Sequence, residues 1–92
     1  MPHILIADDE PNILMLTEML FQDMGMTVST AVDGQDALTK IIALKPDLVI
    51  TDVIMPNKSG FELCKEVRAH PAISDTPIII LSALGDDFNK IN

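Results

Sequence analysis

Asp52 is the residue of this 92-residue sequence whose type and position point most directly to chemistry. It follows residues 48–51, an apolar run rich in β-branched side chains, and it precedes the turn signal Met55-Pro56. Such a run is typical of a strand buried on both faces of a parallel sheet. Ligands of open α/β sheets bind beyond the carboxyl ends of the strands, which is where Asp52 would lie. This stretch alone is equally consistent with an aspartate whose side chain starts a turn.

Two other polar groups follow apolar runs in the same way. Asp8-Asp9-Glu10 comes after residues 3–7, and Ser82-Ala83 comes after residues 78–81. The carboxyl ends of parallel strands share one edge of a sheet, and carboxylates gathered there repel one another unless a cation intervenes. An acidic first turn of a helix would explain Glu10, but not three such strand ends. We therefore predict a site for a hard, oxygen-preferring cation such as Mg²⁺ at this edge.

Strands and helices alternate in the pattern that would position these groups. The strands are predicted at residues 3–7, 27–32, 48–51 and 77–81. Between them, apolar residues recur at helical spacing, as at Ile13, Leu16 and Leu20 of the first segment. Such alternation implies a parallel sheet with right-handed crossovers and helices on both faces. We therefore expect one small α/β domain.

The predicted helices begin and end at capping and breaking residues. Pro11 suits the first turn of the first helix, and Gly25 is a natural stop for it. Ser59 and Glu62 match a capping box that opens the third helix. The other ends are marked by Lys45-Pro46 and His70-Pro71, and a fourth helix is expected to start within residues 88–92 after a turn at 85–87.

The composition predicts the character of the core and of some isolated residues. The sequence has no Trp and no Tyr, so aliphatic and methionine side chains must fill the core. Lys58, in the loop after Asp52, is expected to be a solvated lysine. The methionines expected to fill or edge the core are Met15, Met19, Met24 and Met26.

Charge and cysteine content narrow the classes of partner. The formal net charge of −8 argues against direct binding of nucleic acid or of an anionic membrane surface. No apolar run is long enough to cross a membrane, and the N-terminus lacks the layout of a signal peptide. Cys64 is the only cysteine, so no intramolecular disulfide can form. These features together favour a cytoplasmic location.

The sequence resembles the receiver domain of two-component response regulators, the family of the bacterial chemotaxis regulator. The residues that carry the resemblance are the pair Asp8-Asp9, Asp52 followed by Met55-Pro56 and Gly60, and Ser82-Ala83. It implies a flavodoxin-like three-layer sandwich with a parallel sheet of order 2-1-3-4. The family's fifth strand and last helix are missing, so residues 1–92 would be a receiver domain truncated after the fourth strand and the start of the fourth helix.

The resemblance also implies a function as a phosphoacceptor switch. Asp52 would accept a phosphoryl group from a sensor histidine kinase or a phosphotransfer protein, in a Mg²⁺-dependent, self-catalysed reaction. Mg²⁺ would be held by Asp8, Asp9, Asp52 and the backbone carbonyl of Ile54, with Asp8 acting mainly through water. Ser82 would be the hydroxyl that turns toward the phosphoryl group as the switch.

Other functions remain open at this stage. The family's lysine after the fifth strand is absent, and Lys90 lies too soon after Ser82 to replace it. The chain would then be an interaction module that dimerises through its exposed fourth strand or by exchanging elements. A phosphatase with an aspartate nucleophile would need a second acid at position 54, where Ile54 stands. A flavin carrier is disfavoured because Asp8-Asp9-Glu10 would repel its phosphate.

Overall fold

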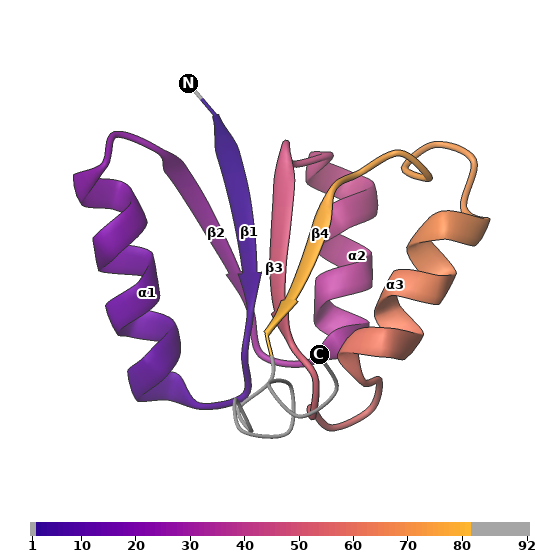
Figure 1. The fold of residues 1–92 in the computed structure, drawn as a ribbon, viewed down its shortest axis with the longest axis horizontal. Coiled ribbons are helices and arrows are strands. Elements are labelled where there is room, and N and C mark those ends of the chain that lie inside the picture. The colour runs from indigo at the N-terminus through magenta and orange to yellow at the C-terminus, as the bar shows by residue number, and fades with distance from the viewer. Residues whose placement is uncertain (1, 82–92) are drawn as a thin grey trace, which may run out of the picture.

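A computed structural model describes residues 2–81 of the chain. The elements, in chain order, are β1 (His3–Ala7), α1 (Pro11–Asp23), β2 (Thr27–Ala31), α2 (Gly34–Leu44), β3 (Leu48–Asp52), α3 (Gly60–Ala69) and β4 (Ile78–Leu81). The strands form one parallel sheet in the order β2-β1-β3-β4. Helix α1 covers one face of the sheet, and α2 and α3 cover the other (Figure 1). The predicted three-layer α/β architecture and strand order are therefore confirmed.

The strand register aligns the carboxyl ends of the four strands. Ala7, the last residue of β1, is aligned with Ala31 of β2 and with Thr51 of β3. Asp52 is aligned in turn with Leu81, the last residue of β4. All four strands thus end at nearly the same level, so the segments that follow them start side by side.

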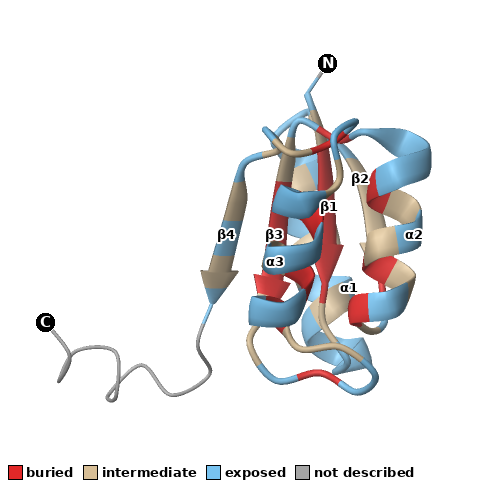
Figure 2. Ribbon diagram, turned by 90° about the vertical axis from the view of Figure 1, so that its right-hand side faces the viewer, coloured by how far each residue is buried: buried red, intermediate tan, exposed pale blue. Residues whose placement is uncertain are grey.

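The main core lies between the sheet and the α2–α3 layer. Its buried side chains are aliphatic or methionine, as the composition predicts. They are Leu5, Ala7, Ala31, Ala37, Ile41, Val49, Met55, Leu63, Val67 and Ile73. Figure 2 shows this buried strip running through the central strands and the inner sides of α2 and α3. Burying such side chains is the main stabilising term in a domain of this size.

The α1 face is packed much less fully. No residue of α1 is buried, and Leu16 and Leu20 are 63% and 59% exposed. The expectation that the methionines fill or edge the core is therefore wrong for Met15, Met19 and Met24, which are exposed, while Met26 is half-buried. The physical reason is that, among the described elements, α1 packs mainly on β1 and β2. Within residues 2–81, no second helix lies on that face of the sheet.

The helix ends follow the predicted signals closely. The capping box is present in full, because Glu62 N donates to Ser59 Oγ and Ser59 N donates to Glu62 Oε1. Strand β2 ends one residue early, because Val32 N donates to the Asp36 carboxylate instead of to the sheet. Helix α2 ends at Leu44 and is followed by its C-cap Lys45, which takes a left-handed φ of 48°.

Several predictions fall on residues that the structure does not describe. These are Ser82 and Ala83, the turn at 85–87 and the helix start at 88–92. Among the described helices, none is both long enough and apolar enough to cross a membrane.

Candidate functional site

Asp52 is the last residue of β3, and its neighbours hold it firmly. Its Oδ1 atom accepts a hydrogen bond of 2.8 Å from Val53 N. Beneath it, the fully buried hydroxyl of Thr51 donates to the Asp52 carbonyl at 3.0 Å and contacts Met55 Sδ at 3.8 Å. Met55 is itself buried in the core. The end of β3 is therefore anchored from below, while the Asp52 side chain remains half-buried at the surface.

Asp8 and Asp9 are positioned by the end of β1. Asp8 N donates to Ala31 O at 3.1 Å, which carries the β1–β2 ladder one residue beyond the strand. Asp8 Oδ1 accepts from Glu10 N at 2.9 Å, and this bond turns the chain toward α1. Because β1 and β3 are neighbours with aligned ends, the turn sets these two residues beside Asp52.

The three carboxylates form one cluster. One carboxylate oxygen from each of Asp8, Asp9 and Asp52 lies within 4.8 Å of the other two. The geometry thus meets the sequence-based expectation for the ends of the first and third strands, whereas Ser82, expected at the same edge, lies outside the described residues. Three oxygen donors at this spacing suit a hard divalent cation, which would leave room for water and for a phosphoryl oxygen.

Electrostatics at the cluster favours a bound cation. Partial burial raises the pKa of Asp52 above the usual 3.8 of an aspartate, and the negative charges of Asp8 and Asp9 raise it further. The hydrogen bond from Val53 N opposes this shift of the pKa. A divalent cation would relieve the repulsion among the three carboxylates, and it would lower the pKa of Asp52 again.

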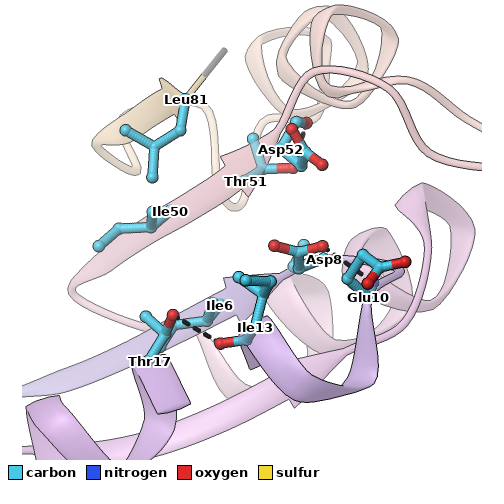
Figure 3. A pocket seen from close by; sticks show the side chains of 10 residues that line it. Ile6, Asp8, Glu10, Ile13, Thr17, Ile50, Thr51, Asp52 and Leu81 are labelled. Atoms are coloured by element: carbon cyan, nitrogen blue, oxygen red, sulfur yellow. Dashed lines mark hydrogen bonds between the residues drawn. The ribbon is translucent and has the colours of Figure 1, made fainter. Parts of the chain in front are cut away.

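A pocket of about 320 Å³ opens beside the cluster on the α1 face. Asp8, Glu10 and Asp52 lie at one end of this pocket (Figure 3). Apolar side chains line the other end, among them Ile6, Ile50, Ile13 and Leu81. The site therefore has a charged end and an apolar end, a division that the sequence pattern did not reveal.

The loop from β3 to α3 contains residues that the sequence analysis missed. Lys58 is not the solvated lysine expected there, because its ammonium group pairs with Glu66 on α3 and its side chain is only 16% exposed. Asn57 donates from Nδ2 to Asp33 Oδ2 at 2.8 Å. Each pair joins this loop to another element, Lys58 to α3 and Asn57 to the β2–α2 turn, so no local sequence pattern predicts it. Ile54 lies in the same loop with its side chain 71% exposed, and Ser82 lies outside the described residues.

Comparison with known proteins gives a consistent result. The family model of the response regulator receiver domain matches residues 4–92. The chain is 42% identical over 89 residues to the probable transcriptional regulator ycf27 of Cyanidium caldarium, covering 97% of this chain and 34% of that protein. It is 39% identical over 88 residues to the alkaline phosphatase synthesis transcriptional regulatory protein PhoP of Bacillus subtilis, covering 96% and 36%. The chain thus spans about a third of the length of these regulators.

Among solved structures, the fold is similar to the chemotaxis response regulator CheY4 of Vibrio cholerae. The TM-score is 0.89 and the sequence identity 36%, and the match covers 99% of this chain and 76% of that one. A Francisella response regulator receiver domain gives a TM-score of 0.86 at 36% identity, covering 99% and 74%. These likenesses extend over nearly all of the chain.

Proposed function

The chain belongs to the response regulator receiver domain family, and we propose that Asp52 is its phosphoacceptor. The proposed donor is a phosphohistidine on a sensor histidine kinase or a phosphotransfer protein. The observation that carries the proposal is the gathering of Asp8, Asp9 and Asp52 within 4.8 Å at the carboxyl edge of the sheet. A carboxylate beside two others is a poor place for a structural aspartate, but a suitable one for phosphoryl transfer with a cation.

In the proposed reaction, a carboxylate oxygen of Asp52 attacks the phosphorus atom. The bond from phosphorus to the histidine nitrogen breaks as the new P–O bond forms, and the imidazole leaves with its electron pair and takes a proton from solvent. Oδ1 is engaged by Val53 N, whereas Oδ2 accepts no hydrogen bond from residues 2–81, so Oδ2 is the proposed nucleophile. The product is an acyl phosphate on Asp52.

The donor set fits Mg²⁺. Asp8, Asp9, Asp52 and the backbone carbonyl of Ile54 would hold the ion, and all four groups offer oxygen atoms. When bound, Mg²⁺ neutralises charge on the incoming phosphoryl group and aligns it. The chain's own part is to hold Asp8 at the end of β1, because its backbone N–H donates to Ala31 O and its Oδ1 accepts from Glu10 N, with Asp9 as the next residue of the same turn. Ser82, which follows β4, is proposed as the hydroxyl that bonds the phosphoryl group and reports its presence.

A small acyl-phosphate donor such as acetyl phosphate tests the proposal directly. With Mg²⁺ present, intact-mass spectrometry should detect one added phosphoryl group on the wild-type chain, and none on Asp52→Asn. Asp23→Asn, which changes an exposed aspartate at the end of α1, is the matched control and should be modified like wild type. Modification that persists in Asp52→Asn, or a wild-type chain that is never modified, would count against the assignment.

A second candidate function is self-association through β4. Among the described residues, β4 pairs only with β3, and Ile79 and Leu81 are 47% and 54% exposed. An apolar strand edge with unpaired backbone groups is a template for another strand, here that of a second copy. Sedimentation velocity should then detect a concentration-dependent dimer in wild type and a monomer in Ile79→Lys. A wild-type monomer at high concentration would exclude this candidate.

A further inference from the structure

We propose that Asp33 and Asn57 are positioning residues for the cation site. Their side-chain hydrogen bond fixes the loop between β3 and α3, and so fixes where Ile54 offers its backbone carbonyl. This role rests on the proposed function of the carboxylate cluster as a Mg²⁺ site. Neither residue would touch the cation, and Asp33 comes from a different part of the chain, the turn between β2 and α2.

Both carboxylate oxygens of Asp33 are in use. Oδ1 caps the first turn of α2 by accepting from Asp36 N at 2.7 Å, and Oδ2 accepts from Asn57 Nδ2 at 2.8 Å. These two bonds, the one from Asp36 first, hold the pKa of Asp33 below its usual value. One residue therefore ties the start of a helix to the tip of a loop 24 residues away.

The backbone at Asn57 needs this support. Its φ is +69°, and Lys58 N donates to Pro56 O at 2.7 Å across it. A bond from residue i+2 back to residue i around a positive φ defines the rarer, strained kind of γ-turn. Such conformations persist only where the surroundings hold them. The hydrogen bond from Asn57 to Asp33 stabilises this conformation at the strained residue itself.

Asn57 lies between two residues of the loop that are held in place by other contacts. Before it, Met55 is anchored in the core. After it, the carbonyl of Lys58 packs against Gly34, where a β carbon would overlap it, and the Lys58 ammonium pairs with Glu66. Between these anchors, the side-chain bond from Asn57 to Asp33 adds a hydrogen-bonded link to the β2–α2 turn beside the packing of Lys58 on Gly34.

Ile54 depends on its neighbours for its position. Its side chain is 71% exposed, so it does not anchor its own peptide group. Mg²⁺ demands near-octahedral geometry with short oxygen contacts, so a small displacement of one carbonyl weakens binding. Residues that orient metal ligands in other proteins change metal affinity by about 10–100-fold when they are mutated.

Two variants remove the bond by different routes. Asn57→Gly keeps a residue that tolerates positive φ but lacks the donor. Asp33→Ser keeps a good N-cap acceptor for Asp36 N, but its side chain is too short to reach Asn57 as well. In Mg²⁺ titrations followed by NMR, each variant should bind about tenfold more weakly than wild type. The double variant should be no weaker than either single one, because both lose the same bond.

Two further variants separate positioning from general stability. Ile41→Val loosens the core beneath α2 without touching the loop, so it should melt earlier but bind Mg²⁺ like wild type. Asp33→Asn should restore binding, because its amide can accept from Asp36 N and donate to a turned Asn57 amide.

The outcomes separate this proposal from the proposed function. If wild type binds Mg²⁺ and Asn57→Gly and Asp33→Ser bind it equally well, the positioning role is wrong and the cation site stands. If wild type binds no Mg²⁺, the proposed function fails and the positioning role fails with it. Weakened binding in Ile41→Val would also overturn the positioning role, because loss of stability alone would then explain the effect.

Discussion

The carbonyl oxygen of Asp52 lies so close to the α carbon of Gly60 that a β carbon at position 60 would overlap it. Gly60 N also donates to Val53 O at 2.8 Å, so the first residue of α3 closes the loop that starts at Asp52. The end of β3 and the start of α3 are thus packed backbone to backbone. The requirement for glycine comes from this close approach, because Gly60 has no positive φ.

Gly60→Ala should therefore disturb stability and the site together. The added methyl group must push α3 away from β3, and overpacking of this kind costs about 1–3 kcal/mol of unfolding free energy. Urea unfolding would measure the loss, and Mg²⁺ titration should reveal weaker binding. Gly25→Ala is the control, because Gly25 has open space around it and a φ of +88°, so its cost is local to the end of α1. If Gly60→Ala bound Mg²⁺ as well as wild type, the packing of Gly60 against Asp52 would not affect the site, and this prediction would be wrong.

Asp52→Asn should stabilise the metal-free protein at neutral pH. The pKa of Asp52 is raised in the folded state by burial and by Asp8 and Asp9, so the folded state holds the proton more tightly than the unfolded state does. Stability is therefore lost as pH rises from the usual 3.8 through the raised pKa. The extra stability of Asp52→Asn over wild type should therefore appear as pH rises through this range, and it should be absent at lower pH.

Thermal unfolding of both proteins at a series of pH values, in chelator, checks this expectation. Asp23→Asn is again the control at an exposed position. Added Mg²⁺ should reverse the order, because wild type then gains binding energy that Asp52→Asn has lost. A variant less stable than wild type in chelator at neutral pH would refute the electrostatic account of the cluster.

Glu62→Gln tests the opposite sign of pH dependence. Hydrogen bonding to Ser59, first to its backbone N–H, lowers the pKa of Glu62 below the usual 4.5. The contribution of the Glu62 carboxylate to folding stability is therefore present at neutral pH, and it is lost as pH falls from 4.5 through the lowered pKa. Glutamine keeps an acceptor but no charge, so wild type should be the more stable protein at pH 7, and the two should converge in acid. A difference in stability that is constant with pH would rule out the charged capping box.

Much of the site could be read from the sequence because its parts sit at strand ends. The run before Asp52 and the run before Asp8 both have the pattern of buried parallel strands, and the carboxyl ends of parallel strands point to one edge of the sheet. The Ser59–Glu62 capping box is equally local, with partners three residues apart. Secondary structure and the carboxylate cluster therefore followed from short-range patterns.

The parts that could not be predicted depend on contacts that no short-range sequence pattern specifies. The sequence around Lys58 does not predict its ion pair with Glu66. The sequence around Asn57 does not predict its hydrogen bond to Asp33. Each pair forms only when the loop is folded against α2 and α3. The prediction that Met15 and Met19 fill or edge the core is wrong for a related reason, because both side chains are exposed. Periodicity identifies the apolar side of a helix, but it does not reveal whether another element covers that side.

Because the two faces of the sheet are covered unequally, we expect a Leu→Ala substitution to lower the unfolding free energy more on α3 than on α1. Leu63 of α3 is fully buried, whereas Leu16 of α1 is 63% exposed. Leu63→Ala should cost about 2–5 kcal/mol of unfolding free energy, because it removes apolar contacts and leaves a cavity in the core. Leu16→Ala should change the unfolding free energy by less than about 0.5 kcal/mol, since it removes mainly exposed surface and alanine is a good helix former. Urea denaturation of both variants measures the contrast in one experiment. If Leu16→Ala proved as costly as Leu63→Ala, α1 would have to be covered in solution, and a dimer found by sedimentation in wild type but not in Leu16→Ala would identify a second copy as the cover.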